Sequence, residues 1–210
     1  LVLSGTILAN ANAMLINDVL GISTGGLNLV GSSYKMNDEG YGELIKDSYE
    51  YCVKQLEEGS VLLKNDGALP LKAAERNVTL FGNNSAHVIY RSGAGGPTPN
   101  DEYVVDMQKA FTDGGFKINK KLYKAYETSG VKVSLNSSGE VPSSFYTSEL
   151  KSTFDSFKDV AIVTFARYGT ENTDPTRVVD GRAYLALSKN EEDLLQMIKD
   201  DSRFTKTIVL

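Results

Sequence analysis

Cysteine, histidine and tryptophan are scarce in this sequence. Of its 210 residues one is cysteine, Cys52, one is histidine, His87, and none is tryptophan. A single cysteine cannot form a disulfide within the chain, and the usual thiolate or imidazole cages for structural zinc need several such ligands. The sequence therefore excludes a disulfide scaffold and a structural zinc site of this type, and we expect no metal and no cofactor.

Basic residues are outnumbered by acidic ones, 22 against 27. The formal net charge is -5 and the isoelectric point is near 5.0, and no local cluster of lysine and arginine offsets this balance. A phosphate backbone would be repelled by such a surface. We therefore expect no nucleic-acid partner.

The overall composition is that of an ordinary globular domain with an extension. Hydrophobic residues make up 41% and charged residues 23% of the chain, enough for a core of normal size. We expect an apolar N-terminal segment and extended arm over residues 1–40, with a Gly-, Ser- and Asn-rich linker at 15–38, and one domain over 41–210.

The first thirteen residues are apolar and admit two interpretations. They form either the tail of a membrane anchor or signal sequence, or a short amphipathic helix packed on the domain. Because the chain begins with Leu1 rather than methionine, we expect a longer gene product. An upstream apolar anchor would place the protein outside the cell or at the cell surface, with the cytoplasm as the alternative.

Hydrophobic periodicity and turn residues predict alternating helices and strands. Helices are expected at 41–58, 104–111, 147–157 and 188–199, a helix or irregular segment at 120–126, and strands at 77–81, 159–165 and 207–210. Thr147 is an expected cap, Ser188 and Glu191 form an expected capping box, and the segment 134–144 is an expected surface loop. This order predicts an α/β fold with a mostly parallel sheet flanked by helices on both faces, truncated at its C-terminal end.

Ligands of open α/β sheets collect at the carboxyl ends of the strands, where two loops stand out here. The loop after Phe81 carries Arg91 and the glycine cluster 93–96, whose spacing fits no phosphate-binding motif, so a nucleotide site is a minor alternative. The loop after Phe165 concentrates charged side chains that suit sugar hydroxyls or acid–base chemistry, although a solvated polar loop is the commoner explanation of charge alone. These side chains are Arg167, Glu171, Asp174, Asp180 and Arg182.

Several segments resemble glycoside hydrolase family 3. The stretch EGSVLLKNDGALPL (58–71), followed by NVTLFGNNSA (77–86), resembles the start of the α/β-sandwich domain of that family. Downstream, DVAIVTFARYGTENTD (159–174), DGRAYLALSKNEEDLL (180–195) and TIVL (207–210) resemble its buried strand, its acidic loop and the helix and strand that follow. The matches agree in order and spacing, and they imply an α/β-sandwich domain over 41–210.

The resemblance also implies site residues. The family has a G-x-E-G-x-D stretch whose glutamate serves as general acid/base, and residues 169–174 align with it, so Glu171 is the catalytic candidate. Asn172 stands where the family usually has glycine, and an Asp-Arg pair comes only later, around Asp180, so Asp174 and Asp180 stay alternatives for the acid/base role. The substrate-binding candidates are Arg167, Asp174, Asp180, Arg182 and Arg91.

The chemistry requires a partner domain. Retaining glycosidases use two carboxyl groups about 5–5.5 Å apart, and the resemblance places the nucleophilic aspartate on a (β/α)8 barrel in an S-D-W motif. This chain has no tryptophan, and 210 residues cannot hold a barrel of ~250 residues as well. We expect the barrel to follow in the same gene product, giving an exo-acting, β-glucosidase-like enzyme on β-glycosides or oligosaccharides, inactive as this chain alone. The alternative is a non-catalytic carbohydrate-binding or barrel-bracing module.

Overall fold

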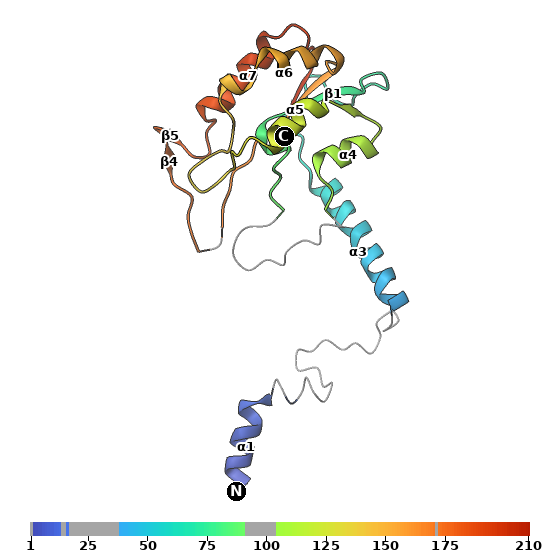
Figure 1. The fold of residues 1–210 in the computed structure, drawn as a ribbon. Coiled ribbons are helices and arrows are strands. Elements are labelled where there is room, and N and C mark those ends of the chain that lie inside the picture. The colour runs from blue at the N-terminus through green and yellow to red at the C-terminus, as the bar shows by residue number, and fades with distance from the viewer. Residues whose placement is uncertain (1, 14–15, 17–37, 91–103, 171) are drawn as a thin grey trace. The chain divides into compact units, whose positions relative to one another are not determined.

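The computed structural model describes residues 2–13, 16, 38–90, 104–170 and 172–210, and it divides into two units, residues 1–63 and 64–210 (Figure 1). The first unit holds helix α1 (Val2–Ala11) and helix α3 (Asp38–Gly59). Helix α3 confirms the helix predicted at 41–58 and begins earlier, with Asp38 and Glu39 in its first turn, where negative charge complements the helix dipole.

Two predictions for the N-terminal region, the linker at 15–38 and the domain boundary at residue 41, stay predictions. The expected linker at 15–38 lies outside the described residues apart from Ile16 and Asp38. In the part of the chain that the structure describes, no helix combines the length and apolar character needed to cross a membrane. The boundary expected between residues 40 and 41 stays a prediction.

The second unit is built on a four-stranded parallel sheet with strand order β2-β1-β3-β6. The strands are β1 (Asn77–Phe81), β2 (Lys117–Ile118), β3 (Val160–Val163) and β6 (Thr207–Val209), and all three pairings are parallel. The expected α/β fold is therefore confirmed, including the three predicted strands. Strand β2 was not predicted from the sequence.

Alternating side chains of β1 and β3 belong to two separate hydrophobic clusters, one on each face of the sheet. Phe81 and Val163 pack on one face with Leu194 and Ile198 of α7, while Leu80 packs on the other face in the cluster that includes residues of α4. Burial on both faces explains why these strands are continuous apolar runs. The helices are α4 (Met107–Asp113), α5 (Lys120–Glu127), α6 (Ser148–Ser152) and α7 (Lys189–Asp200), with 3-10 turns η1 (Asn83–Ser85), η3 (Ser143–Phe145) and η4 (Thr153–Ser156).

Helix starts follow the capping residues. Helix α4 begins later than predicted because Asp106 caps it, its Oδ1 accepting from the backbone N–H of Lys109 at 2.6 Å. Thr147 caps α6 as predicted, but the helix expected over 147–157 is divided between α6 and η4. The predicted capping box of Ser188 and Glu191 is present at the start of α7.

The expected surface loop at 134–144 is wrong for its centre. Glu140 is 4% exposed and Val141 is 1% exposed. The side chain of Asn83, two residues after β1, donates hydrogen bonds to the carbonyl oxygens of Val131 and Gly139, and the second of these bonds holds this segment near the end of the strand. Composition alone predicted a polar loop because the partner that buries it is far away in the sequence.

A second, two-stranded sheet accompanies the first. Strands β4 (Val178–Val179) and β5 (Arg182–Ala183) pair antiparallel around Asp180 and Gly181. Both turn residues have positive φ, 50° and 76°, as a two-residue type I′ hairpin requires. The Asp-Gly pair signals such a hairpin, but it was not predicted.

Candidate functional site

The carboxyl ends of β1 and β3 meet at one edge of the sheet. Gly82, which follows β1 with φ of 86°, lies against the backbone of Thr164, which follows β3. Among the described residues, three buried side-chain oxygens of this edge have no hydrogen-bond partner: Asn84 Oδ1, Ser85 Oγ and Thr164 Oγ1. Unpaired buried oxygens are uncommon and costly. This edge therefore has unmet hydrogen-bonding capacity where α/β sheets bind their ligands.

Glu140 is a buried carboxyl group at the same edge. Its Oε2 accepts from the backbone N–H of Asn83 and its Oε1 from that of Val141, both at 3.0 Å, and the hydroxyl of Tyr146 lies 3.5 Å from Oε1. Burial raises the pKa of Glu140 to about 8, although the two backbone hydrogen bonds act to lower it. At neutral pH the carboxyl group is therefore mostly protonated, and sequence reasoning missed it.

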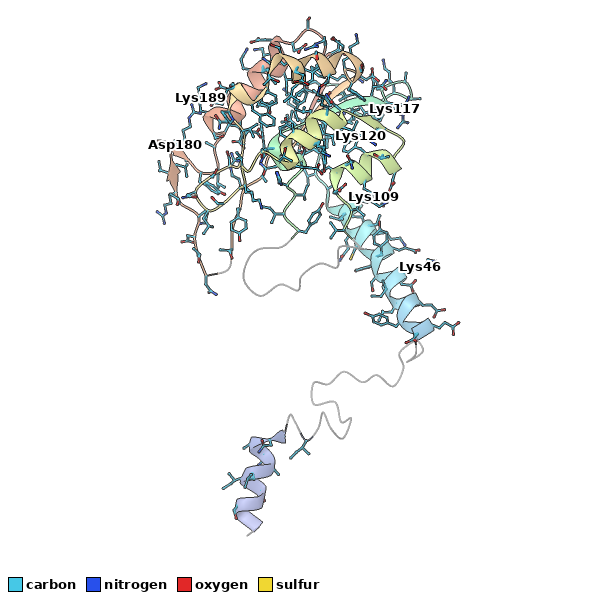
Figure 2. All side chains as sticks on the ribbon, in the orientation of Figure 1. Lys46, Lys109, Lys117, Lys120, Asp180 and Lys189 are labelled. Carbon is cyan, nitrogen blue, oxygen red and sulfur yellow. The ribbon has the colours of Figure 1, made fainter. Side chains whose placement is uncertain are left out.

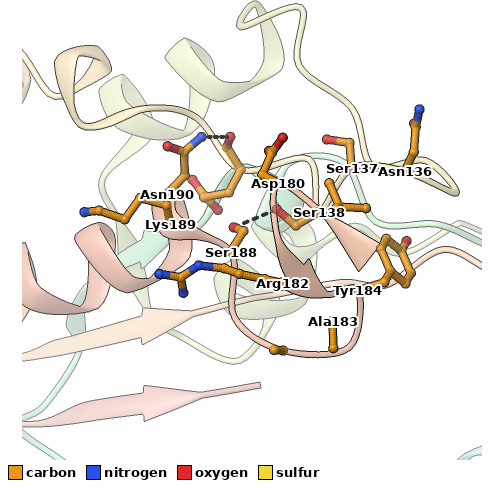
Figure 3. Close-up of a pocket in the computed structure, with 13 residues that line it drawn as sticks. Asn136, Ser137, Ser138, Asp180, Arg182, Ala183, Tyr184, Ser188, Lys189 and Asn190 are labelled. Carbon is orange, nitrogen blue, oxygen red and sulfur yellow. Dashed lines mark hydrogen bonds between the residues drawn. The ribbon is translucent and has the colours of Figure 1, made fainter. Parts of the chain in front are cut away.

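A polar pocket of about 160 Å³ lies between the segment 136–140, the β4–β5 hairpin and the start of α7 (Figure 3). Ser138 donates to the hydroxyl of Ser188 at 2.9 Å, and Asn190 Nδ2 donates to the carbonyl oxygen of Glu140 at 3.0 Å. The pocket gathers hydroxyl, amide, carboxylate and cationic groups, which together can hydrogen-bond a polyhydroxylated ligand. The polar side chains of the lining are Asn136, Ser137, Ser138, Glu140, Asp180, Arg182, Tyr184, Ser188, Lys189 and Asn190.

The hairpin brings two of the predicted substrate-binding residues, Asp180 and Arg182, to this pocket. Figure 2 shows Asp180 at the hairpin on the same side of the domain as Lys189, away from Lys117 of β2. Arg182 Nη1 is also 2.5 Å from Glu192 Oε1, and this ion pair raises the pKa of the guanidinium. The site is therefore assembled by an element that the sequence analysis did not expect.

Two other predicted site residues, Arg167 and Asp174, do not line this pocket. Asp174 is exposed and is not part of the pocket lining. Glu171 and Arg91 lie outside the described residues. Thr170 and Thr173 form an antiparallel bridge.

Arg167 has all five of its guanidinium N–H donors satisfied inside the domain. Its Nε donates to Tyr184 O (2.7 Å), Nη1 to Ala166 O (2.8 Å) and Glu191 Oε1 (2.6 Å), and Nη2 to Ala186 O (2.6 Å) and Glu191 Oε2 (2.8 Å). A direct contact between Arg167 and a substrate stays a prediction that these bonds do not support.

Comparison with known proteins identifies the domain. The family model described as "Glycosyl hydrolase family 3 C-terminal domain" matches residues 60–210. The chain belongs to glycosyl hydrolase family 3. The resemblance seen in the sequence motifs is thereby confirmed, and all the predicted site residues fall inside the matched range.

The family 3 chain is similar to two solved structures of β-glucosidase 3B from Thermotoga neapolitana, one in complex with α-D-glucose and one with glucose. Both have a TM-score of 0.59 and 24% sequence identity, and the matches cover 78% and 79% of this chain. The chain spans about a quarter of the length of these β-glucosidase chains, 24% in each case. This likeness shows a shared fold. A comparison with the curated proteins found no match.

Proposed function

We propose that this chain is the α/β-sandwich portion of an exo-acting retaining glycosidase of the β-glucosidase type. The observation that carries the proposal is the family 3 match over residues 60–210, which includes the charged loop that follows β3. The similar Thermotoga neapolitana protein is a β-glucosidase solved in complex with glucose, which supports a terminal β-linked glucose as the substrate.

In this proposal Glu171 is the general acid/base and a (β/α)8 barrel outside these residues supplies the nucleophile. The nucleophilic carboxylate attacks the anomeric carbon while Glu171 protonates the departing glycosidic oxygen. Glu171 then takes a proton from the water that hydrolyses the glycosyl–enzyme intermediate. Asp174 and Asp180 remain the alternatives for this role.

The polar pocket would contribute hydrogen bonds to the substrate. Asp180 and Arg182 line it, and the lining offers both donors and acceptors for sugar hydroxyls. At about 160 Å³ the pocket is smaller than the roughly 300–1,000 Å³ of ordinary ligand sites. A surface of this size fits one part of a site that a second domain completes. The location of the enzyme outside the cell stays a prediction.

Replacing Glu171 by glutamine in the complete enzyme tests the acid/base role. Glutamine cannot donate a proton, so hydrolysis of glycosides with poor leaving groups should slow by about 10²–10⁴-fold. Aryl glucosides with good leaving groups need little protonation and should slow much less in the glycosylation step. The matched variants are Asp174→Asn and Asp180→Asn. Equal losses on both substrate types for Glu171→Gln would sink the assignment. Full activity in Glu171→Gln and in both matched variants would favour the non-catalytic module.

A further inference from the structure

The chain leaving β3 is tied to the start of α7 by a single arginine. Arg167 follows the strand closely, and its guanidinium bonds three different places: its own segment at Ala166, the turn after β5 at Tyr184 and Ala186, and α7 at Glu191. Because all five donors are used, the side chain has one orientation that satisfies them together. The contact network of Arg167 thus joins three segments that are separate in the sequence.

Glu191 completes the network from the other side. Its side chain is 0% exposed, while that of Arg167 is 20% exposed, and the two form a fork of two parallel hydrogen bonds. Glu191 Oε2 also accepts from the backbone N–H of Ser188 at 2.7 Å, within the capping box of α7. A buried ion pair adds little net stability over apolar residues of the same size, but a forked pair restricts geometry strongly. We therefore expect the Arg167–Glu191 pair to fix the orientation of the two segments that carry these residues rather than to add much stability.

The hydroxyl group of Tyr184 fixes the next residue of the loop. It accepts from the backbone N–H of Tyr168 at 2.8 Å and donates to the carbonyl oxygen of Ser134 at 2.6 Å. Tyr184 is 6% exposed, so these bonds are shielded from water. Two successive residues, Arg167 and Tyr168, are therefore held shortly before the segment that carries Glu171.

We propose that Arg167, Glu191 and Tyr184 are positioning residues that fix the loop after β3 against α7 for acid/base chemistry. The inference rests on the proposed function, because it takes Glu171 as the group that the loop presents. Displacing a catalytic group by about 1 Å can cost about 10²-fold in rate. A loop that carries such a group therefore needs its first residues, here Arg167 and Tyr168, to be fixed by several hydrogen bonds at once.

The first test is Arg167→Lys in the complete enzyme. Lysine keeps the positive charge beside Glu191 but cannot form the fork or reach five acceptors. We expect kcat/KM, which reports on the glycosylation step, to fall about 10–100-fold on glycosides with poor leaving groups and less than about 3-fold on aryl glucosides with good ones.

The matched control is Arg203→Lys. Arg203 also binds a carboxylate through two nitrogens, with Nε 2.8 Å from Asp201 Oδ1 and Nη2 2.6 Å from Asp201 Oδ2, and it reaches Asp155 at 3.0 Å. It precedes β6 and so lies towards the amino ends of the strands, away from the edge that carries the loop. The control should lose stability without any dependence on the leaving group.

Tyr184→Phe provides a second variant that keeps the ring and removes one hydroxyl. It should show the same dependence on the leaving group with a smaller loss, about 3–10-fold. Backbone hydrogen exchange at residues 168–170 should quicken in Arg167→Lys and Tyr184→Phe and stay unchanged in Arg203→Lys. This readout does not depend on which carboxyl group acts in catalysis.

The outcomes separate the inference from the proposed function. If both variants match Arg203→Lys in exchange and in leaving-group dependence, the inference is overturned. A second outcome is that Arg167→Lys and Tyr184→Phe show faster exchange but no dependence on the leaving group, although Glu171→Gln does show that dependence. This outcome overturns the positioning role. Equal losses for Glu171→Gln on both substrates overturn the proposed function. The exchange rate at residues 168–170 then still decides whether these hydrogen bonds anchor Arg167 and Tyr168.

Discussion

Glu140 and Glu191 are two buried carboxyl groups with contrasting partners. Glu191 is paired with the guanidinium of Arg167, whereas Glu140 receives hydrogen bonds from the neutral N–H groups of Asn83 and Val141. The nearby charge that acts on Glu140 is that of Glu191, which also raises its pKa. Among the residues that the structure describes, no cation pairs with Glu140, and burial without such a partner is the physical reason why Glu140 favours its protonated form.

The unfolding free energy should therefore depend on the protonation of Glu140. Its pKa is about 8 in the folded chain and near 4.5 when exposed, so the folded state binds more protons between these values. Stability should fall as pH rises from about 5 to 8, by as much as about 4 kcal/mol from this one group. Urea unfolding at pH 5, 6.5 and 8 measures this change in the free energy of unfolding, and Glu140→Gln should make it smaller.

A matched variant separates burial from the loss of any carboxylate. Glu149 is exposed and pairs with Lys121, which lowers its pKa, so Glu149→Gln should retain the slope of the unsubstituted chain. If Glu140→Gln and the unsubstituted chain lose stability in parallel across this pH range, Glu140 does not titrate there. The slopes of unfolding free energy against pH are compared, rather than the free energies themselves, because the amide in Glu140→Gln has a hydrogen-bonding cost of its own.

Single residues were predictable where their partners are local. The capping box of Ser188 and Glu191 spans three residues, so its pattern is visible in the sequence. Glu140 could not be found in this way, because its burial depends on Asn83, 57 residues away. The charges of Arg167 and Glu191 were visible, but nothing local shows that they face each other.

At the scale of elements, the long and strongly patterned segments were predictable. Strands β1 and β3 are buried on both faces and therefore appear as apolar runs. Strand β2 has two residues and each strand of the β4–β5 hairpin has two, too few to show a period. These short elements depend on pairing with neighbours, and one of them shapes the candidate pocket.

The close approach of β1 and β3 at their carboxyl ends depends on Gly82. A Cβ at this position would overlap the carbonyl oxygen of Thr164, and φ of 86° is unfavourable for any side chain. Gly82→Ala should lower the unfolding free energy by roughly 3 kcal/mol or more, since the backbone strain and the overlap add. Urea unfolding of the chain measures this loss.

Gly115→Ala is the control for backbone strain alone. Gly115 has φ of 80°, but a Cβ there would meet no atom within 4 Å. Its substitution should cost about 1 kcal/mol. Similar losses for the two variants would show that the strand ends can separate at little cost, which contradicts a tight contact between Gly82 and Thr164.

At the scale of the whole molecule, the chain is one part of a larger catalytic unit in our proposal. It spans about a quarter of the similar β-glucosidase, 24% of that chain, and a retaining mechanism needs two carboxyl groups in different roles. The purified 210-residue chain should therefore hydrolyse an aryl β-glucoside no faster than buffer. Hydrolysis that is lost in Glu171→Gln would contradict the placement of the nucleophile outside these residues.

Family membership was accessible from sequence because several motifs fall in a fixed order along the chain. The match over residues 60–210 confirms what EGSVLLKNDGALPL and DVAIVTF indicated together. The candidate site was predictable only as a loop after a buried strand. Its three-dimensional composition depends on a hairpin whose Asp-Gly signal was not used and on a buried segment that no motif marks.

The anchoring of Arg167 and Tyr168 has a consequence for engineering. The far end of the same loop is also tied down, because the backbone N–H of Thr176 donates to the carbonyl oxygen of Leu135 at 2.9 Å. A segment whose backbone N–H groups are hydrogen-bonded to the rest of the domain at both ends is a natural unit for transplantation. Loops of equal span from other members of the family could be exchanged between residues 169 and 175, as binding loops are exchanged on antibody frameworks, while the sheet beneath keeps its packing.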